Sequence, residues 1–243
     1  MIRAALRRAM ASAILFGFGM TGAIAQAQAT PFSHSRIRFV HAAEEIGTVD
    51  VYLGGALAFE QRGFKSVSDY ASIPAGILRV QAIAATSKAT VMNIAISLAP
   101  QTDYTLVLPP SQAGQQPQSA LLQDDNQLPG QSAIRFRLAN LSPDVGSVQT
   151  MAVISGTEHN LSPMLFRSSS SYAELPPGEA LIHLSDIKRA TVKLEPDTVY
   201  TFFLFEEHGH ATIGISVDAQ GVRYLLPTTG GELSELAGPR APQ

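Results

Sequence analysis

Apolar and polar residues alternate with a period of two along most of this chain. In residues 36–39, Ile37 and Phe39 fall on one side and Arg36 and Arg38 on the other, and residues 135–138 repeat the arrangement. Alternation of this kind is typical of a strand with one buried face. Both segments are therefore predicted to be half-buried edge or surface strands.

The same period predicts further strands, over 49–53, 56–59, 78–82 and 94–98. Gly54-Gly55 is predicted to form a two-residue hairpin turn between the first two of them. No window of a dozen residues beyond the N-terminal segment combines helical spacing with caps. Short strands separated by Gly, Pro, Asn or Ser predict an all-β protein built from antiparallel sandwiches.

Four short segments recur in the same order, each about a hundred residues later, which predicts two tandem copies of one small domain. The fold class expected is therefore two antiparallel β-sandwiches of the immunoglobulin-like or transthyretin-like kind. The pairs are Ile37-Arg38-Phe39 with Ile134-Arg135-Phe136, 46–49 with 145–148, 70–76 with 172–178, and 98–104 with 194–200.

Two of the repeated segments have the residues of turns and corners. Pro74-Ala-Gly76 and Pro177-Gly178 supply a fixed φ followed by a residue that tolerates positive φ. In Leu-x-Pro-x-Thr-x-Tyr, the tyrosine opens a strand after a proline corner, which predicts tyrosine corners at Tyr104 and Tyr200. Their hydroxyls are expected to bond the backbone a few residues upstream, rather than to stack on a ligand.

Residues 1–29 have the features of a cleaved secretory signal. Arg3, Arg7 and Arg8 precede an apolar stretch over 11–23, and A-x-A sites end at residue 29. The alternatives are a retained amphipathic segment or a membrane anchor. We expect a periplasmic or secreted protein with no membrane span after cleavage.

The domain limits follow from composition: sandwich 1 over 30–126, sandwich 2 over 127–227 and a flexible tail over 228–243. The joining segment 109–131 is rich in Pro, Ser, Gln and Gly, and its Ala120-Leu121-Leu122 is expected to add a last strand to sandwich 1.

The following Asp124-Asp125-Asn126 suggests a calcium site, but calcium binding needs six or more oxygens in a defined loop. A solvated strand end is the favoured interpretation.

Charge and composition exclude several function classes. Without the three signal arginines, 14 basic residues stand against 20 acidic ones, a sign that argues against nucleic acid as a partner. The chain has no cysteine, which rules out thiol catalysis and cysteine metal sites. It has no Trp, and Tyr52, Tyr70, Tyr172 and Tyr224 are too dispersed to form a sugar-binding platform, so only a weak polysaccharide contact is expected.

Candidate chemistry is sparse. No G-x-S-x-G, phosphate-binding loop or H-E-x-x-H occurs. Ser185-Asp-Ile-Lys188 fits S-x-x-K but falls in a short hairpin rather than at a helix N-terminus. His208 and His210 of Glu206-Glu-His-Gly-His210 could share a metal, although a solvated hairpin turn is favoured. His41 and Asp50 could approach across paired strands, with Leu138 and Gln149 at the matching places of copy two, and an ordinary polar contact is favoured there.

The first copy resembles a domain of unknown function that occurs singly or in tandem in secreted bacterial proteins. Its pattern R-x-R-F-x-H-A, V-D-V-Y and Y-x-x-x-P-A-G is matched at 36–42, 49–52 and 70–76. The second copy departs from it at 138–142 and lacks V-D-V-Y. That half is similar to the accessory-protein family of periplasmic alginate O-acetylation, at Leu175-Pro-Pro-Gly178 and Leu194-Glu-Pro-Asp-Thr-Val-Tyr200.

These resemblances imply a non-catalytic exported accessory or adaptor protein in exopolysaccharide modification, contacting envelope proteins that include a membrane-bound O-acetylation complex. No catalytic, cofactor-binding or metal-ligating residue is predicted, and no cofactor. The alternative is a secreted structural or adhesive surface module. The sequence leaves open the polymer, the partner, the binding face and the oligomeric state.

Overall fold

A computed structural model describes residues 33–111, 119–143, 148–154, 156–184 and 188–221. The predicted signal over 1–29 and the tail over 228–243 lie outside the described residues. The contacts place the described strands of both copies in a single compact unit. No helix in these ranges is long and apolar enough to cross a membrane.

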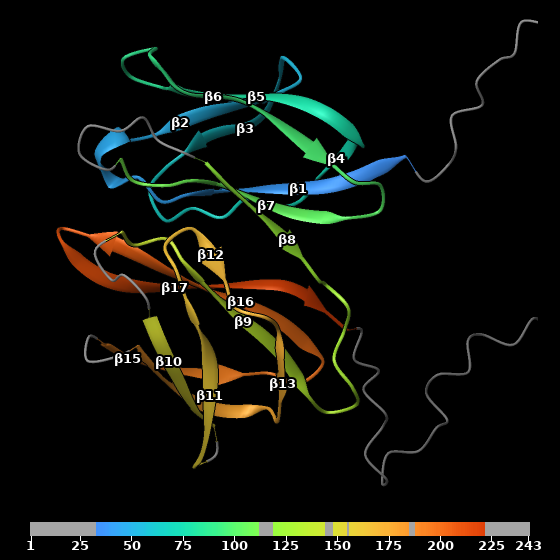
Figure 1. The fold of residues 1–243 in the computed structure, drawn as a ribbon, viewed down its shortest axis with the longest axis vertical. Coiled ribbons are helices and arrows are strands. Elements are labelled where there is room, and N and C mark those ends of the chain that lie inside the picture. Colours follow the sequence, from blue (N-terminus) through green and yellow to red (C-terminus); the bar gives the residue numbers. More distant parts are fainter. Residues whose placement is uncertain (1–32, 112–118, 144–147, 155, 185–187, 222–243) are drawn as a thin grey trace, which may run out of the picture. The chain divides into compact units, whose positions relative to one another are not determined.

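The described residues of copy one form eight strands in two sheets, and those of copy two form nine strands in a similar pair of sheets (Figure 1). The strands of copy one are β1 (His34–His41), β2 (Val49–Leu53), β3 (Ala56–Arg62), β4 (Ala71–Pro74), β5 (Gly76–Ala84), β6 (Thr90–Leu98), β7 (Asp103–Leu108) and β8 (Ala120–Asp124), with a 3-10 turn η1 (Glu44–Ile46). The strands of copy two are β9 (Ile134–Asn140), β10 (Val148–Ile154), β11 (Thr157–Met164), β12 (Ser168–Ser169), β13 (Ala173–Leu175), β14 (Gly178–Leu184), β15 (Lys188–Leu194), β16 (Thr198–Glu207) and β17 (His210–Gln220).

Each copy is a sandwich of two sheets. In copy one the sheet orders are β4-β1-β7-β8 and β3-β2-β5-β6; in copy two they are β12-β9-β16-β17, with β13 also on β9, and β11-β10-β14-β15. The all-β sandwich prediction is confirmed, and β8 is the predicted last strand of copy one. Pairing is antiparallel except in β1·β7 and β9·β16, which are parallel.

Strand register shows which residues of the two copies are equivalent. Arg38 faces Thr105 on β7, and Arg137 faces Thr201 on β16 in the same way. Strands β1 and β9 are thus related by 99 residues, as in the pairing of 36–39 with 135–138, whereas β7 and β16 are related by 96. The match of Ile37-Arg38-Phe39 to Ile134-Arg135-Phe136 was displaced by two residues, which keeps the face but shifts the register.

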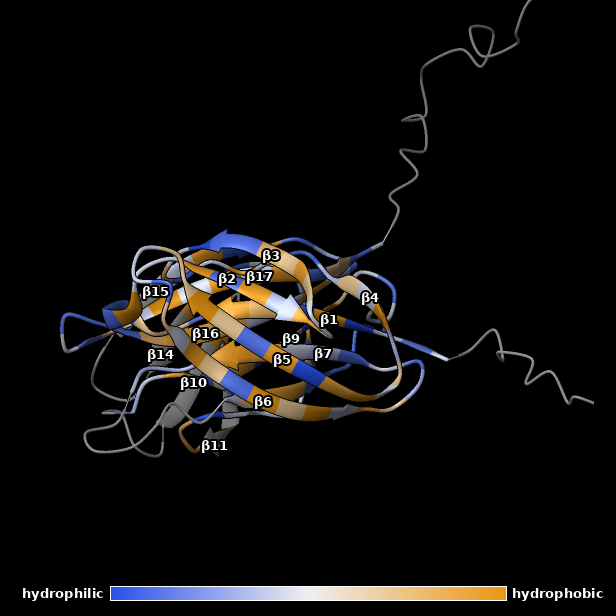
Figure 2. Cartoon of the chain, turned by 90° about the horizontal axis from the view of Figure 1, so that it is seen from above, coloured by the Kyte–Doolittle hydropathy of each residue, from blue (hydrophilic) through white to orange (hydrophobic). Residues whose placement is uncertain are grey.

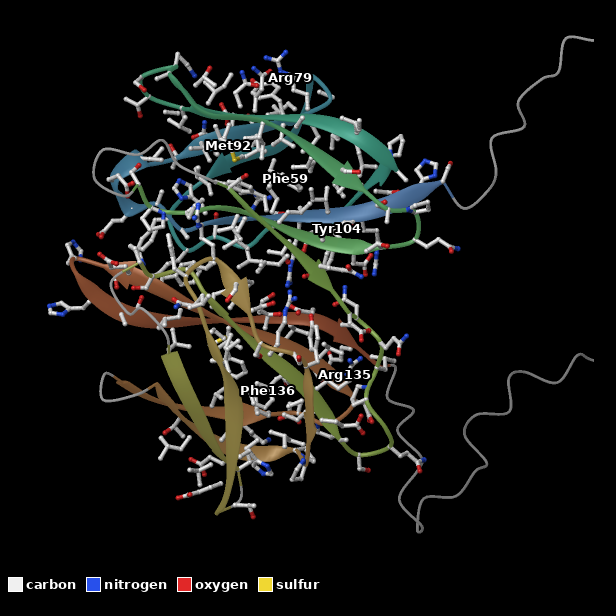
Figure 3. All side chains as sticks on the ribbon, in the orientation of Figure 1. Phe59, Arg79, Met92, Tyr104, Arg135 and Phe136 are labelled. Atoms are coloured by element: carbon white, nitrogen blue, oxygen red, sulfur yellow. The ribbon has the colours of Figure 1, made fainter. Side chains whose placement is uncertain are left out.

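Three apolar clusters hold the unit together. One lies inside each sandwich, and the labels of Figure 3 show Phe59 and Met92 between the sheets of copy one. Along β5 and β6, hydrophobic and hydrophilic residues alternate (Figure 2), as expected for strands with one buried face. The third cluster joins the copies, and comprises Val40, Ala42, Val107, Ala120 and Leu122 of copy one with Ala139, Leu141, Phe203 and Phe205 of copy two.

The prediction of an edge or surface strand was wrong for β1 and β9. Each is an inner strand of its sheet, and Arg38 and Arg137 are each only 1% exposed. The apolar Ile37 and Phe136 face the sandwich cores, whereas the arginine faces are covered by the other copy. Both faces of these strands are therefore buried, one by the apolar core of its sandwich and the other by charged and apolar contacts with the second copy.

The predicted turns are present in both copies. Gly76 and Gly178 have φ values of 122° and 140°, which glycine adopts readily and residues with a side chain rarely adopt. Gly54-Gly55 joins β2 to β3, and His208-Gly209 joins β16 to β17 with positive φ at both positions. The hairpin interpretation of the His-Gly segment is confirmed.

Both tyrosine corners are also confirmed. The hydroxyl oxygen of Tyr104 accepts a hydrogen bond from the backbone N–H of Ala99 at 3.1 Å, and that of Tyr200 accepts one from Glu195 at 2.9 Å. Each bond reaches five residues upstream across the proline corner. The tyrosines are 8% and 5% exposed, so they are corner residues and do not face a ligand.

Replacing Tyr104 by Phe is expected to lower the free energy of unfolding by about 1 kcal/mol, because the Ala99 N–H would lose its partner. Tyr200→Phe should cost about the same. Urea unfolding of the purified variants measures both losses. Tyr52→Phe, on the outward face of β2, is the matched control, and a loss as large in that control would contradict the corner assignment.

Candidate functional site

Four charged side chains form a buried network between the two copies. The arginine of each inner strand reaches across to an aspartate of the other copy: Arg38 pairs with Asp218, and Arg137 pairs with Asp124. All four side chains are at most 2% exposed. Two positive and two negative charges balance, which is the condition under which ionised groups are tolerated in an interior.

Arg38 of β1 is held by groups from both copies. Its Nε donates to Thr105 Oγ1 at 2.8 Å, and its Nη1 donates to Asp218 at 2.6 Å and to Ser216 Oγ at 3.0 Å. Burial opposes the charge of Arg38, yet the nearby Asp218 carboxylate raises the pKa of the guanidinium above its usual range. Arg38 Nη2 has no hydrogen-bond partner within the described residues.

Arg137 of β9 repeats these contacts in copy two. Its Nε donates to Thr201 Oγ1 at 3.0 Å and its Nη1 to the Gln123 carbonyl at 2.8 Å, while Nη2 donates to Asp124. Asp124 also accepts from Thr105 Oγ1 at 2.7 Å and from the Tyr70 hydroxyl at 2.6 Å. Its carboxylate is fully buried, so the prediction of a solvated strand end at Asp124 was wrong.

Tyr70 and Tyr172 cover the arginines. The Arg38 guanidinium carbon lies 5.0 Å from the Tyr70 ring centre, and that of Arg137 lies 4.8 Å from the Tyr172 ring centre. Burial raises the pKa of both phenols, so both stay protonated and can donate to the aspartates. Tyr70 and Tyr172, two of the dispersed tyrosines, thus belong to the contact between the copies and do not form a sugar-binding platform.

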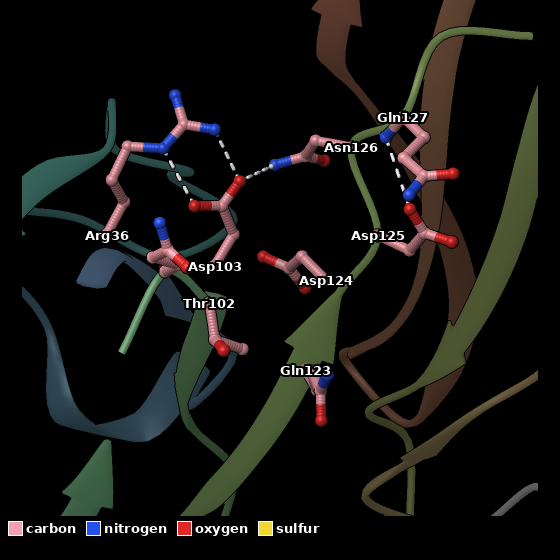
Figure 4. Close-up of a pocket in the computed structure, with 9 residues that line it drawn as sticks. Arg36, Thr102, Asp103, Gln123, Asp124, Asp125, Asn126 and Gln127 are labelled. Carbon is pink, nitrogen blue, oxygen red and sulfur yellow. Dashed lines mark hydrogen bonds and ion pairs between the residues drawn. The ribbon is translucent and has the colours of Figure 1, made fainter. Parts of the chain in front are cut away.

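Beside this network lies an open polar hollow of about 490 Å³ (Figure 4). Its rim is built around Asp103, which accepts hydrogen bonds from Arg36 Nε at 2.7 Å, from Arg36 Nη2, and from Asn126 Nδ2 at 2.7 Å. The lining residues are all polar: Arg36, Gln101, Thr102, Asp103, Gln123, Asp124, Asp125, Asn126 and Gln127. A second recess of about 280 Å³ shares Arg36, Gln101, Thr102 and Asp103 with it.

The carboxylates of the hollow are already paired. Asp103 is bound by Arg36, Asp124 by Arg137, and Asp125 by Arg135, whose hydrogen bond lowers the pKa of Asp125. The groups left free are amides: within the described residues no hydrogen bond involves the exposed side chains of Gln101, Gln123 and Gln127. The hollow therefore suits an uncharged ligand with hydroxyl or amide groups better than an ion.

His41 and Asp50 do not approach one another. His41 is buried at the end of β1, where its Nε2 lies 2.6 Å from the Gly47 carbonyl and its Nδ1 accepts from the Ala43 N–H at 3.2 Å. Asp50, on a strand of the other sheet, accepts from the Gln61 N–H. The residue equivalent to His41 is Asn140 rather than Leu138, because Asn140 Oδ1 accepts from the N–H two residues later in the same way.

Burial lowers the pKa of His41 below 6.5, so the folded protein binds this proton less readily than the unfolded chain. Stability from His41 is present above pH 6.5 and is lost as the pH falls towards the folded pKa, by about 1.4 kcal/mol per pH unit in that window. His41→Asn, the residue of copy two, should remove this loss. Urea unfolding at pH 7.5 and 5.0 measures it, with exposed His210→Asn as control; identical pH dependence in wild type and His41→Asn would contradict it.

The remaining candidates do not form a site. His208 Nε2 lies 3.2 Å from Glu44, and Glu207 pairs with Lys65, so this hairpin contacts copy one. The described residues contain no group of three His, Asp or Glu side chains that could hold a metal. Lys188 begins β15, and Ser185 lies outside the described residues.

Residues 35–151 match the family model of a domain of unknown function, DUF4397. The range is just under half of the chain and runs from β1 through all of copy one into β10, so it includes Arg38, Tyr70, Asp124 and Arg137. The resemblance of the first copy to a domain of unknown function is confirmed at this level. The likeness of the second half to the alginate accessory family stays a prediction.

No curated protein matches the chain. One similar solved structure is the family 26 carbohydrate-binding module CBMbc from Eubacterium rectale Amy13K, in complex with maltoheptaose. It is 9% identical, and the alignment covers 74% of this chain and 96% of that one with a TM-score of 0.25. A TM-score this low supports no conclusion about fold or ligand.

Proposed function

We propose that this protein is a non-catalytic accessory module, exported to the periplasm or beyond, that works by contacting other envelope proteins. The observation that carries the proposal is that the repeated arginines and tyrosines, with two aspartates, are used inside the unit. Arg38, Tyr70, Asp124 and their equivalents in copy two bind one another inside the unit, where they hold two sandwiches together. Because these residues bind one another inside the protein, they have a structural role and none of them is available to act on a substrate.

The polar hollow supports a second, weak contact with polysaccharide hydroxyls. Its free amides can both donate and accept, and its carboxylates are held in place by arginines and Asn126. Affinity electrophoresis in gels containing neutral and anionic polysaccharides tests this contact. Asn126→Ala with Gln127→Ala should abolish any retardation, and Asn93→Ala on the exposed part of β6 is the matched control.

The finer proposal is that the partner complex performs O-acetylation of an alginate-type polymer. It rests on the sequence likeness of Leu175-Pro-Pro-Gly178 and Leu194–Tyr200 alone, which are turn and corner residues in this fold. Deleting the gene should lower the ester-linked acetate of the secreted polymer, and a tagged chain should co-purify with a membrane acyltransferase. Unchanged acetate would reject the O-acetylation role.

The non-catalytic character has its own test. The purified chain is expected to release no acetate from acetylated polysaccharide, with or without Ser185→Ala. Release that depends on Ser185 would contradict the proposal. Co-purification of surface or matrix proteins, in place of an acyltransferase, would favour the adhesive alternative.

A further inference from the structure

Strand β17 is a long sheet edge without the usual protection. It runs for 11 residues at the end of the order β12-β9-β16-β17, and its stretch from Ala211 to Val217 contains no charge and no proline. Its irregularity is confined to the end beyond Val217, where one residue bulges out of the pairing with β16. Edges of this kind pair readily with another strand, and natural proteins normally block them with charges, proline or bulges.

The core-facing row of β17 is partly open. Ile215 pairs with Phe202 and Val217 with Tyr200, both members of the core of copy two, yet Ile215 and Val217 are 42% and 55% exposed. Ile213 completes this row and packs against the core. Strand β17 thus exposes apolar side chains of sandwich 2, and on its outer side no described strand pairs with its backbone N–H and C=O groups.

Two other edge strands in the described part of the chain, β8 and β6, do not combine these features. In β8, the equivalent of β17, the register with β7 places Leu121 and Gln123 where β17 has Ile215 and Val217. Leu121 is partly buried, and Gln123 is polar. In β6, an uncharged edge strand of copy one, the core-facing Met92 and Ile96 are buried. Of these three described edge strands, β17 alone exposes core-facing apolar side chains on an uncharged stretch.

We propose that β17 pairs with β17 of a second copy, antiparallel across a two-fold axis at Ile215, so that two sheets join into one. In this register Ile215 faces Ile215 of the second copy, and Val217 faces Ile213 of the second copy. The open apolar rows of both sandwiches then cover each other. The inference is independent of the proposed function.

Self-complementarity singles out a second copy as the occupant. On the other face of β17, Ser216 would stand opposite Gly214, so no like charges meet. Because Ile215 is the middle residue of β17, this register engages the regular part of the strand from Ile213 to Val217. A symmetric contact of one patch with itself is the commonest way in which soluble chains form dimers.

The absence of cysteine from the chain allows a direct test of the register. In the exported full-length protein, Ile215→Cys should form a disulfide-linked dimer under mild oxidation. Val217→Cys, two residues along on the same face, should not, because the two Val217 positions would be about 13 Å apart. Sedimentation equilibrium of the wild type should give twice the mass of one chain.

A charge at the axis provides the second measurement. Ile215→Lys should weaken the dimer by at least about tenfold, because two lysines would meet at the axis. Leu57→Lys, on edge strand β3 and 48% exposed, is the matched control and should leave the dimer intact. Far-ultraviolet circular dichroism confirms that each variant is folded. A wild type that stays monomeric, or cross-linking at residue 217 in place of residue 215, would overturn the proposal.

Discussion

Replacing Asp124 by Asn is expected to lower the free energy of unfolding by about 3–5 kcal/mol. The carboxylate is fully buried and accepts hydrogen bonds from Arg137, Thr105 and Tyr70. Arg38 Nε lies 3.7 Å from it as well. Removing the negative charge would leave Arg137 buried without its counter-ion, and that uncompensated charge is the main cost.

Urea unfolding at neutral pH measures this loss, and the neighbouring Asp125 provides the matched control. Asp125 pairs with Arg135, but its side chain is 50% exposed, so Asp125→Asn should cost less than about 1 kcal/mol. Asp218→Asn should resemble Asp124→Asn, because Asp218 is the fully buried partner of Arg38. Similar small losses in all three variants would show that the network adds little to stability.

The sequence predicted the fold for a physical reason that also explains its main error. Alternation along 36–39 identifies a strand whose Ile37 and Phe39 face a core, and this is correct. Alternation cannot show what lies against the polar face of the strand. The sequence pattern is the same whether the arginines on that face contact water or the carboxylates of a second copy. Arg38 was therefore predicted to be exposed, whereas the second copy buries it.

A signal for the network was nevertheless present in the duplication. The repeat contains Arg38 with Arg137 and Tyr70 with Tyr172. An arginine that recurs at the same position of a predicted strand in both copies suggests that each arginine binds the same kind of residue. Asp124 and Asp218 could not be paired from the sequence, since no repeated motif surrounds them. Only the registers of β8 on β7 and β17 on β16 place them at equivalent positions.

The polar hollow was not predictable, because it depends on differences between the copies. Arg36 and Arg135 are equivalent, but Arg135 is occupied by Asp125 and by the Gln127 carbonyl. Arg36 instead binds Asp103, at the rim of the open hollow. Residues Asp125 and Gln127 of the segment between the copies thus cover the surface at Arg135 but not the equivalent surface at Arg36. No strand or turn pattern in the sequence reveals this difference.

The joint between the copies also depends on the close approach of a strand to an aromatic ring. Gly214 of β17 pairs with Phe203, and a Cβ at residue 214 would lie 2.6 Å from Cε2 of Phe205. Phe205 is fully buried in the cluster that joins the copies, and its ring centre is 6.0 Å from that of Phe64 in copy one. The ring therefore has little room to move away from a new methyl group.

Gly214→Ala is accordingly expected to lower the free energy of unfolding by about 1–3 kcal/mol, as overpacking of a filled core does. Gly63→Ala is the control, because its Cβ would make only an ordinary contact of 3.7 Å with Thr48, and it should change stability by less than about 0.5 kcal/mol. Combining Gly214→Ala with Phe205→Leu should cost less than the sum of the two single changes, since the smaller side chain makes room for the methyl group. If the two losses of unfolding free energy were strictly additive, the loss caused by Gly214→Ala would not arise from a clash with the Phe205 ring. The contact between the copies would then tolerate a side chain at residue 214.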